Sequence, residues 1–368
     1  MRKRIAVLLF VAALGCMPLA NAIKPGGGVK APSYTGRNLG VLPGDSYSYG
    51  YGVSDAGSVV GFSGYSTSES SASHPFYWDR ATGVMVQLPT SGATSEGTGR
   101  AYAVAGKTKA SEYAVGDEDA PDTSTHAVIW RAPSLQTPAI VLDSGESAAS
   151  FAYGVNDDGT AVGSWGGETA IWAHDGSGNY AMTTIDIFEN QPEGARDINN
   201  QGIAVGYGYD PSGTQANAFL LAEGNVHALP PGGTDPYARA LSVGDVFTTT
   251  AGEEFVFVSG STTAVDGTEH AVRWTVNTGT WEITETKVLA KDWSSGVNTS
   301  GDVACTNGTS ARQSATLWRR DVFITLKPPK GMTDAASFGL ARTALSPTYV
   351  VGTASSSATT RAVIWEVR

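Results

Sequence analysis

The sequence predicts an all-β fold, a seven-bladed β-propeller built from four-stranded antiparallel blades. Three observations lead to this prediction. The composition combines 45 glycines and nine tryptophans with only 16% charged residues, which favours short strands joined by turns. One pattern, complete in residues 152–172, returns at similar spacing along the chain. Two independent alignments of that pattern both count seven copies.

The repeat unit reads as four strands. Residues 152–156 alternate small and apolar side chains, and Asn156, Asp157, Asp158 and Gly159 then tolerate the positive φ of a tight hairpin turn. Three further β-prone runs follow at residues 160–164, 169–172 and 180–185. A single four-stranded meander cannot bury both faces, so the copies must stack on each other or close into a ring.

Two alignments give the number of copies. The first uses a small residue expected at the end of the second strand, namely Gly61, Gly116, Gly163, Gly206, Gly260, Cys305 and Gly352. The second uses the large residue of the third strand, namely Trp78, Trp130, Trp172, Leu221, Trp274, Trp318 and Trp365. The mean period of about 48 residues suits one propeller blade. Cys305, in a glycine's place, is expected to be a small buried side chain.

The turn after the first strand keeps its Asn/Asp-to-Gly chemistry in four copies. The second, fifth and seventh copies depart from it, at residues 107–112, 244–254 and 343–348. We expect irregular first hairpins in those three copies.

The chain begins and ends out of phase with the repeat. Residues 37–44 match the expected fourth strands at 85–89, 139–143, 225–230 and 323–328, whereas the chain stops after the third strand of the seventh copy, residues 361–367. We therefore predict that residues near 39–42 pair with residues near 363–367 and close the ring, which removes free sheet edges. The expected division is a flexible lead-in at 23–36 and a propeller at 37–368.

The first 22 residues resemble a secretory signal peptide. Arg2, Lys3 and Arg4 precede an apolar run at 5–15 that is too short to span a bilayer, and cleavage is expected after Ala22. A rival interpretation places a lipid anchor on Cys16, although residues 13–15 match that signal poorly. The expected location is secreted or periplasmic, with no transmembrane segment in the mature chain.

The net charge of −11 limits the possible partners. Cleavage after Ala22 would remove three positive charges and leave −14, which disfavours nucleic acid or an anionic membrane as a partner. If Cys16 leaves with the leader, Cys305 is the remaining thiol and packing must hold the fold. We expect a monomer without cofactors.

The repeats resemble a known family. The segments at 74–78, 126–130, 217–221 and 270–274 look like degenerate His-Ala-Phe-Leu-Trp, and residues 154–159 and 229–233 match the accompanying motifs. Over residues 37–368 the chain is similar to the HAF-type extracellular repeat family of bacteria. This resemblance implies a secreted or surface repeat protein, and it implies no particular activity.

In a propeller, the loops that enter each first strand share one face with the loops between the second and third strands. These loops are long and variable here, so a ligand, either a glycan or a protein, is expected at this channel mouth. The aromatic, guanidinium and carboxylate groups suited to hold it are Tyr47, Tyr49, Arg100, Glu193, Arg196, Asp235, Tyr237, Arg239 and Trp293. The alternative is a polysaccharide lyase or glycoside hydrolase that uses carboxylates, tyrosines and arginines of the same mouth.

Other motifs favour structure over chemistry. His74, His126 and His270 occupy one repeated position, which a structural hydrogen bond explains better than an active site. Residues 117–122 are acidic but lack the ladder of a calcium loop, so a solvated loop is expected there and no metal is assigned. Solvated charge is also the simpler interpretation of the mouth residues, and we therefore expect binding rather than catalysis.

Overall fold

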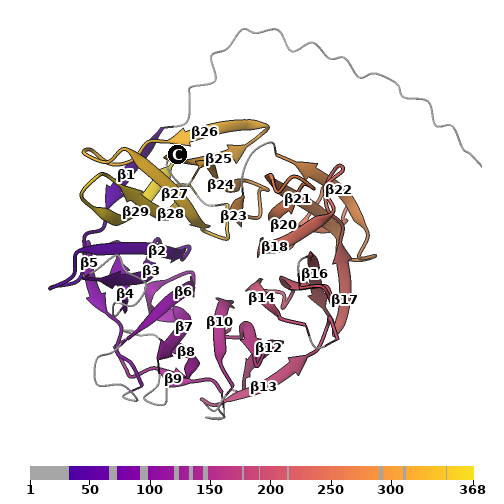
Figure 1. Cartoon of the computed structure of the whole chain (residues 1–368), viewed down its shortest axis with the longest axis horizontal. Coiled ribbons are helices and arrows are strands. Elements are labelled where there is room, and N and C mark those ends of the chain that lie inside the picture. The colour runs from indigo at the N-terminus through magenta and orange to yellow at the C-terminus, as the bar shows by residue number, and fades with distance from the viewer. Residues whose placement is uncertain are drawn as a thin grey trace, which may run out of the picture. The chain divides into compact units, whose positions relative to one another are not determined.

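The computed structural model describes residues 33–65, 73–91, 98–119, 124–131, 136–143, 148–175, 178–189, 191–213, 215–289, 293–309, 312–344 and 346–368. Within these residues, seven separate antiparallel sheets surround a central channel (Figure 1). The predicted seven-bladed β-propeller is therefore confirmed. The expected leader, its cleavage site and Cys16 lie outside the described residues.

Each blade runs from an inner strand at the channel to an outer strand at the rim. In this order the first three blades are β2 (Tyr47–Val53), β3 (Val59–Gly64), β4 (Ser73–Asp79) and β5 (Val84–Gln87); β6 (Gly99–Ala105), β7 (Tyr113–Asp119), β8 (Thr125–Arg131) and β9 (Ile140–Val141); and β10 (Ser150–Val155), β11 (Ala161–Trp165), β12 (Glu168–His174) and β13 (Tyr180–Ile185). The next three are β14 (Glu193–Ile198), β15 (Ala204–Tyr209), β16 (Ala216–Ala222) and β17 (Asn225–Leu229); β18 (Tyr237–Val243), β20 (Glu254–Thr263), β21 (Glu269–Asn277) and β22 (Ile283–Val288); and β23 (Ser294–Val297), β24 (Val303–Thr309), β25 (Arg312–Arg319) and β26 (Val322–Leu326).

The seventh blade joins the two ends of the propeller. Its inner three strands are β27 (Asp334–Leu340), β28 (Thr348–Ser355) and β29 (Thr360–Val367), and its outer strand is β1 (Tyr34–Asn38). The register runs from Tyr34 opposite Val367 to Asn38 opposite Val363. The N-terminal strand thus completes the last blade, as the sequence predicts.

The position of this closing strand differs from the expectation by several residues. The predicted partners, residues 39–42, follow the strand, and residues 34–36, assigned to a flexible lead-in, belong to it. Leu39 shows why. Its N–H donates to the carbonyl of Ala362, as the N–H of Leu88 donates to that of Pro75 at the end of β5. Leu39 is therefore the buried leucine that ends a fourth strand, and aligning Leu42 with Leu88 shifted the expected register.

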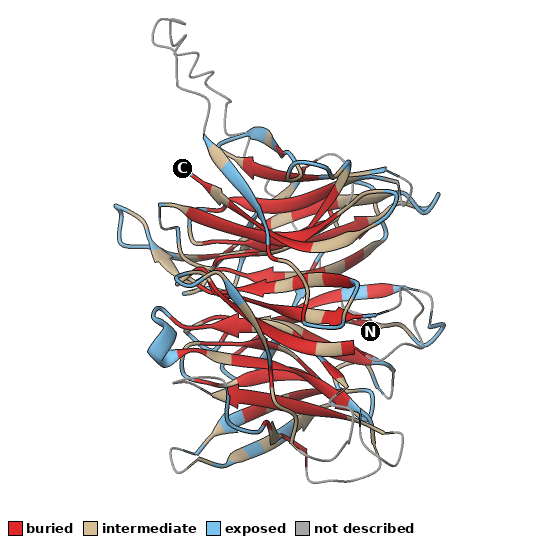
Figure 2. Ribbon diagram, turned by 90° about the vertical axis from the view of Figure 1, so that its left-hand side faces the viewer, coloured by how far each residue is buried: buried red, intermediate tan, exposed pale blue. Residues whose placement is uncertain are grey.

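The apolar core is divided between the blades. The described residues form seven buried clusters, and each cluster joins two neighbouring blades. The large residue of each third strand packs toward the preceding blade, and Trp130, Trp274 and Trp365 also donate an indole N–H to a backbone carbonyl of that blade. Exposed residues gather in the loops and outer strands (Figure 2). The third-strand tryptophans are core, as predicted.

The first hairpins differ between blades where the sequence indicates. Blade two has a 3₁₀ turn at Lys109–Ser111, and blade five carries an extra strand, β19 (Phe247–Thr248), which pairs with β20. In the regular turn, the Asn156 side-chain oxygen accepts from the N–H groups of Asp158 and Thr160. Asn199 and Asn298 accept the same two N–H groups in their own turns, so all three asparagines hold the first hairpin turn.

Candidate functional site

A β-bulge in every inner strand determines which side chains face the channel. Each inner strand skips one residue in its pairing with the second strand, and a bulge redirects the side chain at that point. All seven skipped residues line one central cavity with a volume of about 130 Å³. They are Tyr51, Tyr102, Tyr153, Arg196, Leu241, Ser295 and Phe338.

The repeated glycine explains the bulge. Gly163 does not end the second strand, as the sequence suggests, but lies within it, opposite the bulge of β10. A Cβ atom at Gly163 would stand 1.8 Å from the carbonyl oxygen of Phe151, so no larger side chain fits. Cys305 takes this place in blade six, opposite Ser294 at the start of the short strand β23. Cys305 is 1% exposed, which confirms the prediction of a small buried side chain.

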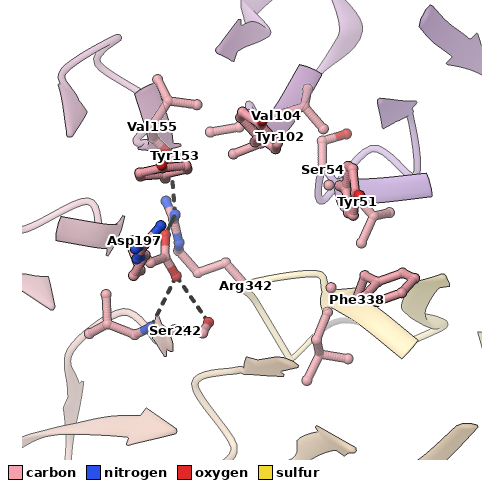
Figure 3. A pocket seen from close by; sticks show the side chains of 18 of the residues that line it. Tyr51, Ser54, Tyr102, Val104, Tyr153, Val155, Asp197, Ser242, Phe338 and Arg342 are labelled. Carbon is pink, nitrogen blue, oxygen red and sulfur yellow. Dashed lines mark hydrogen bonds and ion pairs between the residues drawn. The ribbon is translucent and has the colours of Figure 1, made fainter. Parts of the chain in front are cut away.

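Arg342 crosses the channel toward the tight-turn end. It follows β27 in blade seven and reaches the opposite side of the ring, where it donates to the carbonyl of Val155 and pairs with Asp197 at 3.1 Å (Figure 3). Asp197 also accepts from the Ser242 hydroxyl and the Val243 N–H. This ion pair is therefore fully engaged, and sequence analysis had not singled out either residue.

A second pocket, here called the lateral pocket, lies between blades three and four and has a volume of about 410 Å³. Two aromatic pairs line it. Phe151 and Tyr153 stack with centroids 5.8 Å apart, and Tyr207 meets Tyr209 edge to face at 6.0 Å. The Arg196 guanidinium lies between the pairs, 4.2 Å from the Tyr153 ring centroid and 4.6 Å from that of Tyr207. Its Nη2 also donates to the Tyr207 hydroxyl at 3.0 Å.

Of the predicted binding residues, Arg196 and Glu193 line this pocket, but Glu193 is engaged by backbone groups. Glu193 is only 7% exposed, and its carboxylate accepts the backbone N–H groups of Thr169, Ile187 and Phe188 at 2.9–3.2 Å. Burial raises its pKa, against these hydrogen bonds. Glu193 therefore holds the neighbouring loops together, and Arg196 is the charged group available to a ligand.

Tyr47, Tyr49 and Arg100 lie together over blade one, outside the lateral pocket. Tyr49 stacks on Phe62 at 5.1 Å, the edge of Tyr47 meets Phe62 at 6.1 Å, and the Arg100 guanidinium lies 5.5 Å above Phe62. We call this set of four residues the blade-one cluster. Phe62 belongs to a second strand, and the sequence signal for it is its position directly after the repeated Gly61.

Asp235, another of the predicted binding residues, is engaged by two neighbouring side chains. Its Oδ2 accepts from the Thr262 hydroxyl at 2.7 Å and lies 2.8 Å from His270 Nδ1. These contacts lower its pKa, although burial alone would raise it. Asp235 therefore fixes the loop that enters blade five.

The remaining candidates, Arg239, Tyr237 and Trp293, do not line either cavity. Arg239 pairs with Glu269 at 3.2 Å and lies 5.5 Å from the Tyr207 ring centroid, at the edge of the lateral pocket. Tyr237 and Trp293 are half-buried and are absent from the lining of either cavity. The structure thus gathers no single constellation from the nine predicted residues.

The three repeated histidines all pair with carboxylates. His74 lies 3.2 Å from Asp45, and His126 lies 2.8 Å from Asp143, an aspartate that also accepts from the Ser150 hydroxyl. His270 and Asp235 form the third pair. The expected structural role is confirmed, but the partner is a side chain rather than backbone. Three of the aspartates at the mouth are thereby used to anchor loops.

The acidic run at 117–122 is not a solvated loop where the structure describes it. Asp117 and Glu118 are buried in β7, and residues 120–122 lie outside the described residues. Asp117 Oδ1 has no hydrogen-bond partner. Burial raises the pKa of Asp117 to about 7, against the opposing effects of Tyr102 and Arg100. Burial likewise raises the pKa of Tyr51 to about 12.

Two features are absent from the described part of the chain. No group of three His, Cys, Asp or Glu side chains there could hold a metal ion. No helix there is long and apolar enough to cross a membrane.

Comparison with known proteins shows the fold and nothing narrower. No protein-family model matches the sequence, and no curated protein matches it. The crystal structure of the RRP9 WD40 repeats matches 90% of this chain and 97% of that chain, with 11% identity and a TM-score of 0.54. The WD40 propeller domain of Doa1 matches with 13% identity over 90% and 97% of the two chains, at a TM-score of 0.43. A gluconolactonase, XC5397 from Xanthomonas campestris, matches with 9% identity over 91% and 90%, at 0.41. The likeness to the RRP9 repeats, at 11% identity, shows the propeller fold alone, so function must be argued from the site.

Proposed function

We propose that this propeller is a non-catalytic binding module that holds a glycan in the lateral pocket at its channel mouth. The observation that carries the proposal is the arrangement of Phe151, Tyr153, Tyr207 and Tyr209 around the Arg196 guanidinium. Flat rings cover the apolar faces of sugars, and a guanidinium supplies several directed donors for their oxygens. The pocket is open enough for such a ligand, with a volume of about 410 Å³.

The state of the carboxylates favours binding over catalysis. Hydrolysis by the usual mechanism needs two carboxyl groups on either side of the scissile bond. Glu193 and Asp235, the two carboxylates among the predicted binding residues, are occupied by backbone amides and by the His270 and Thr262 side chains. Arg196 remains, and it can hold a ligand without any proton transfer.

The proposal also includes the cellular location and the family of the protein. A secreted or periplasmic monomer agrees with the leader-like first 22 residues and with the acidic composition. Membership of the HAF-type repeat family is proposed on the repeat motifs alone.

The test uses the mature protein and a panel of tetrasaccharides, namely cello-, xylo-, chito- and galacturono-oligosaccharides. Calorimetry should find binding to at least one of them, and reducing-end and unsaturation assays should find no turnover. Tyr207→Ala and Tyr209→Ala should each weaken binding by about fivefold, since stacking on one ring contributes on the order of 1 kcal/mol. Phe323→Ala, which removes a ring at the outer rim, is the matched control and should bind normally. Turnover that is lost in Arg196→Gln would instead establish the enzyme, and binding unchanged in both tyrosine variants would place the ligand elsewhere.

A further inference from the structure

Aromatic rings form a continuous arc along the mouth and upper channel. Phe338 meets Tyr51 at 5.4 Å, Tyr51 meets Tyr102 at 5.7 Å, and Tyr102 meets Tyr153 at 5.4 Å, where the Arg196 guanidinium continues the series. Figure 3 shows these rings as neighbours around one side of the cavity. The arc therefore connects blade seven with the lateral pocket through blades one, two and three.

The blade-one cluster extends this arc outward. Tyr51 also stacks on Phe62 at 5.6 Å, and Phe62 carries the stacked Tyr49 and the overlying Arg100. Arg100 is exposed. One chain-like ligand could therefore lie on rings from the blade-one cluster to the lateral pocket and pass a guanidinium at each end.

The charge of this arc is opposite to that of the whole protein. The net charge is −11, yet three aspartates of the mouth are withdrawn from solvent beside their histidine partners. The side chains of Asp45, Asp143 and Asp235 are 2%, 0% and 8% exposed. Asp117 is also buried, without a histidine partner and near Tyr102 and Arg100. Among the described residues, Arg100 and Arg196 are the charged groups in contact with the rings of the arc and the blade-one cluster, while Asp55, Asp157 and the Asp197–Arg342 pair line the same channel.

We infer that the ligand is an acidic oligosaccharide, a chain of uronate sugars that lays its ring faces on the aromatic arc and its carboxylates on Arg100 and Arg196. This inference rests on the proposed function and adds the charge of the ligand to it. Carboxylate–guanidinium hydrogen bonds are stronger than neutral ones and are often bidentate, so they select an acidic sugar over its neutral counterpart. A distributed negative charge elsewhere on the protein repels acidic chains and leaves the arc as their favourable place.

The experiment compares two ligands with the same sugar backbone, one with free carboxylates and one with neutral methyl esters. Tetragalacturonate and its fully methyl-esterified form have the same backbone and the same ring faces, and calorimetry measures both at low and at high potassium chloride. We expect the acid to bind at least tenfold more tightly than the ester and to lose that advantage in high salt. A mannuronate tetramer is included so that the result does not depend on one sugar.

Arg196→Gln provides the decisive variant. It should reduce acid binding by about tenfold and weaken its salt dependence, because Arg100 is then the remaining guanidinium, and it should reduce ester binding by a smaller factor; thermal unfolding checks that it folds. Arg320→Gln changes the net charge equally at an exposed turn on the rim and should change neither affinity. Ester or cellotetraose binding as tight as acid binding would overturn the acidic ligand and leave the glycan module standing. Absence of binding to every oligosaccharide would overturn both.

Discussion

Asp117 makes the stability of this protein depend on pH in a specific direction. Its pKa is about 7 in the folded protein against an ordinary 3.8, chiefly because burial penalises the charged form. Below pH 3.8 both the folded and the unfolded states carry the proton, and the group has no effect. As the pH rises from about 4 to about 7, the unfolded chain releases the proton first, so the folded state is progressively destabilised. Well above pH 7 both states have lost the proton, and the folded state keeps the full free-energy cost of burying the charged carboxylate.

The magnitude follows from the same values. A pKa that moves from 3.8 to about 7 corresponds to a penalty of about 4 kcal/mol at high pH, at 1.36 kcal/mol per pH unit. Asp117→Asn keeps the shape of the side chain and an acceptor for Tyr102, and it carries no charge to bury. It should therefore raise the free energy of unfolding by about 4 kcal/mol at pH 8 and leave it unchanged near pH 4.

Urea titrations at several pH values between 4 and 8, followed by the fluorescence of the buried tryptophans, measure this difference. Asp158→Asn is the matched control, because Asp158 is exposed in the tight-turn face and its removal should give no pH-dependent difference from the wild type. A wild-type-to-Asp117→Asn difference that stays constant from pH 4 to pH 8 would refute the reasoning. An Asp117→Asn protein that is less stable than the wild type at pH 8 would do the same.

Three further predictions concern the architecture. Gly163→Ala should destabilise the protein by about 3 kcal/mol or more, because its Cβ would collide with backbone 1.8 Å away, whereas Gly279→Ala in an exposed turn should be nearly neutral in the same urea titration. A chain lacking residues up to Asn38 should unfold at lower temperature and self-associate in light scattering, because it exposes the edge of β29; a monomer of normal stability would contradict the closure. Asp143→Ala should cost about 1–3 kcal/mol for each buried donor it leaves unpaired, including His126, and an unchanged midpoint in chemical denaturation would argue against that anchor.

The sequence predicted the parts of the fold that repeat. Blade number, the core position of Trp130 and its counterparts, and the ring closure all follow from a period that appears seven times. Register is harder, because two leucines, Leu39 and Leu42, fit the apolar pattern of a strand end equally well. Only the hydrogen bond from Leu39 to Ala362 distinguishes them, and it depends on a strand distant in sequence.

The site was less predictable for a different reason. Residue type suggested Glu193 and Asp235 as ligand groups, but their partners lie on other strands and loops, so their engagement is invisible in the local sequence. Asp117 shows the reverse case, since an acidic run reads as a solvated loop until β7 buries it. The aromatic arc itself had a usable signal. Each ring belongs to the residue directly after the one that pairs with the repeated glycine, as Tyr153 follows Ala152 opposite Gly163. The sequence reveals these positions only to a reader who knows that the glycine lies opposite a bulge.

The repeated glycine of the second strand and the bulged residue of the inner strand opposite it are under different constraints. The glycine is constrained because the opposite carbonyl comes within about 2 Å of any Cβ, and this holds in blade after blade. The bulged residue is unconstrained by that pairing, because its side chain enters the channel rather than a core. Backbone geometry thus places seven side chains around the channel, and any residue can occupy each place.

The actual occupants are unevenly distributed. Blades seven, one, two and three contribute Phe338, Tyr51, Tyr102 and Tyr153, whereas blades five and six contribute the smaller Leu241 and Ser295. A channel that served only to close the ring would have no reason to place all its rings on one side. The asymmetry is what a ligand bound along one arc requires, and it supports locating the function on the aromatic side of a symmetric fold.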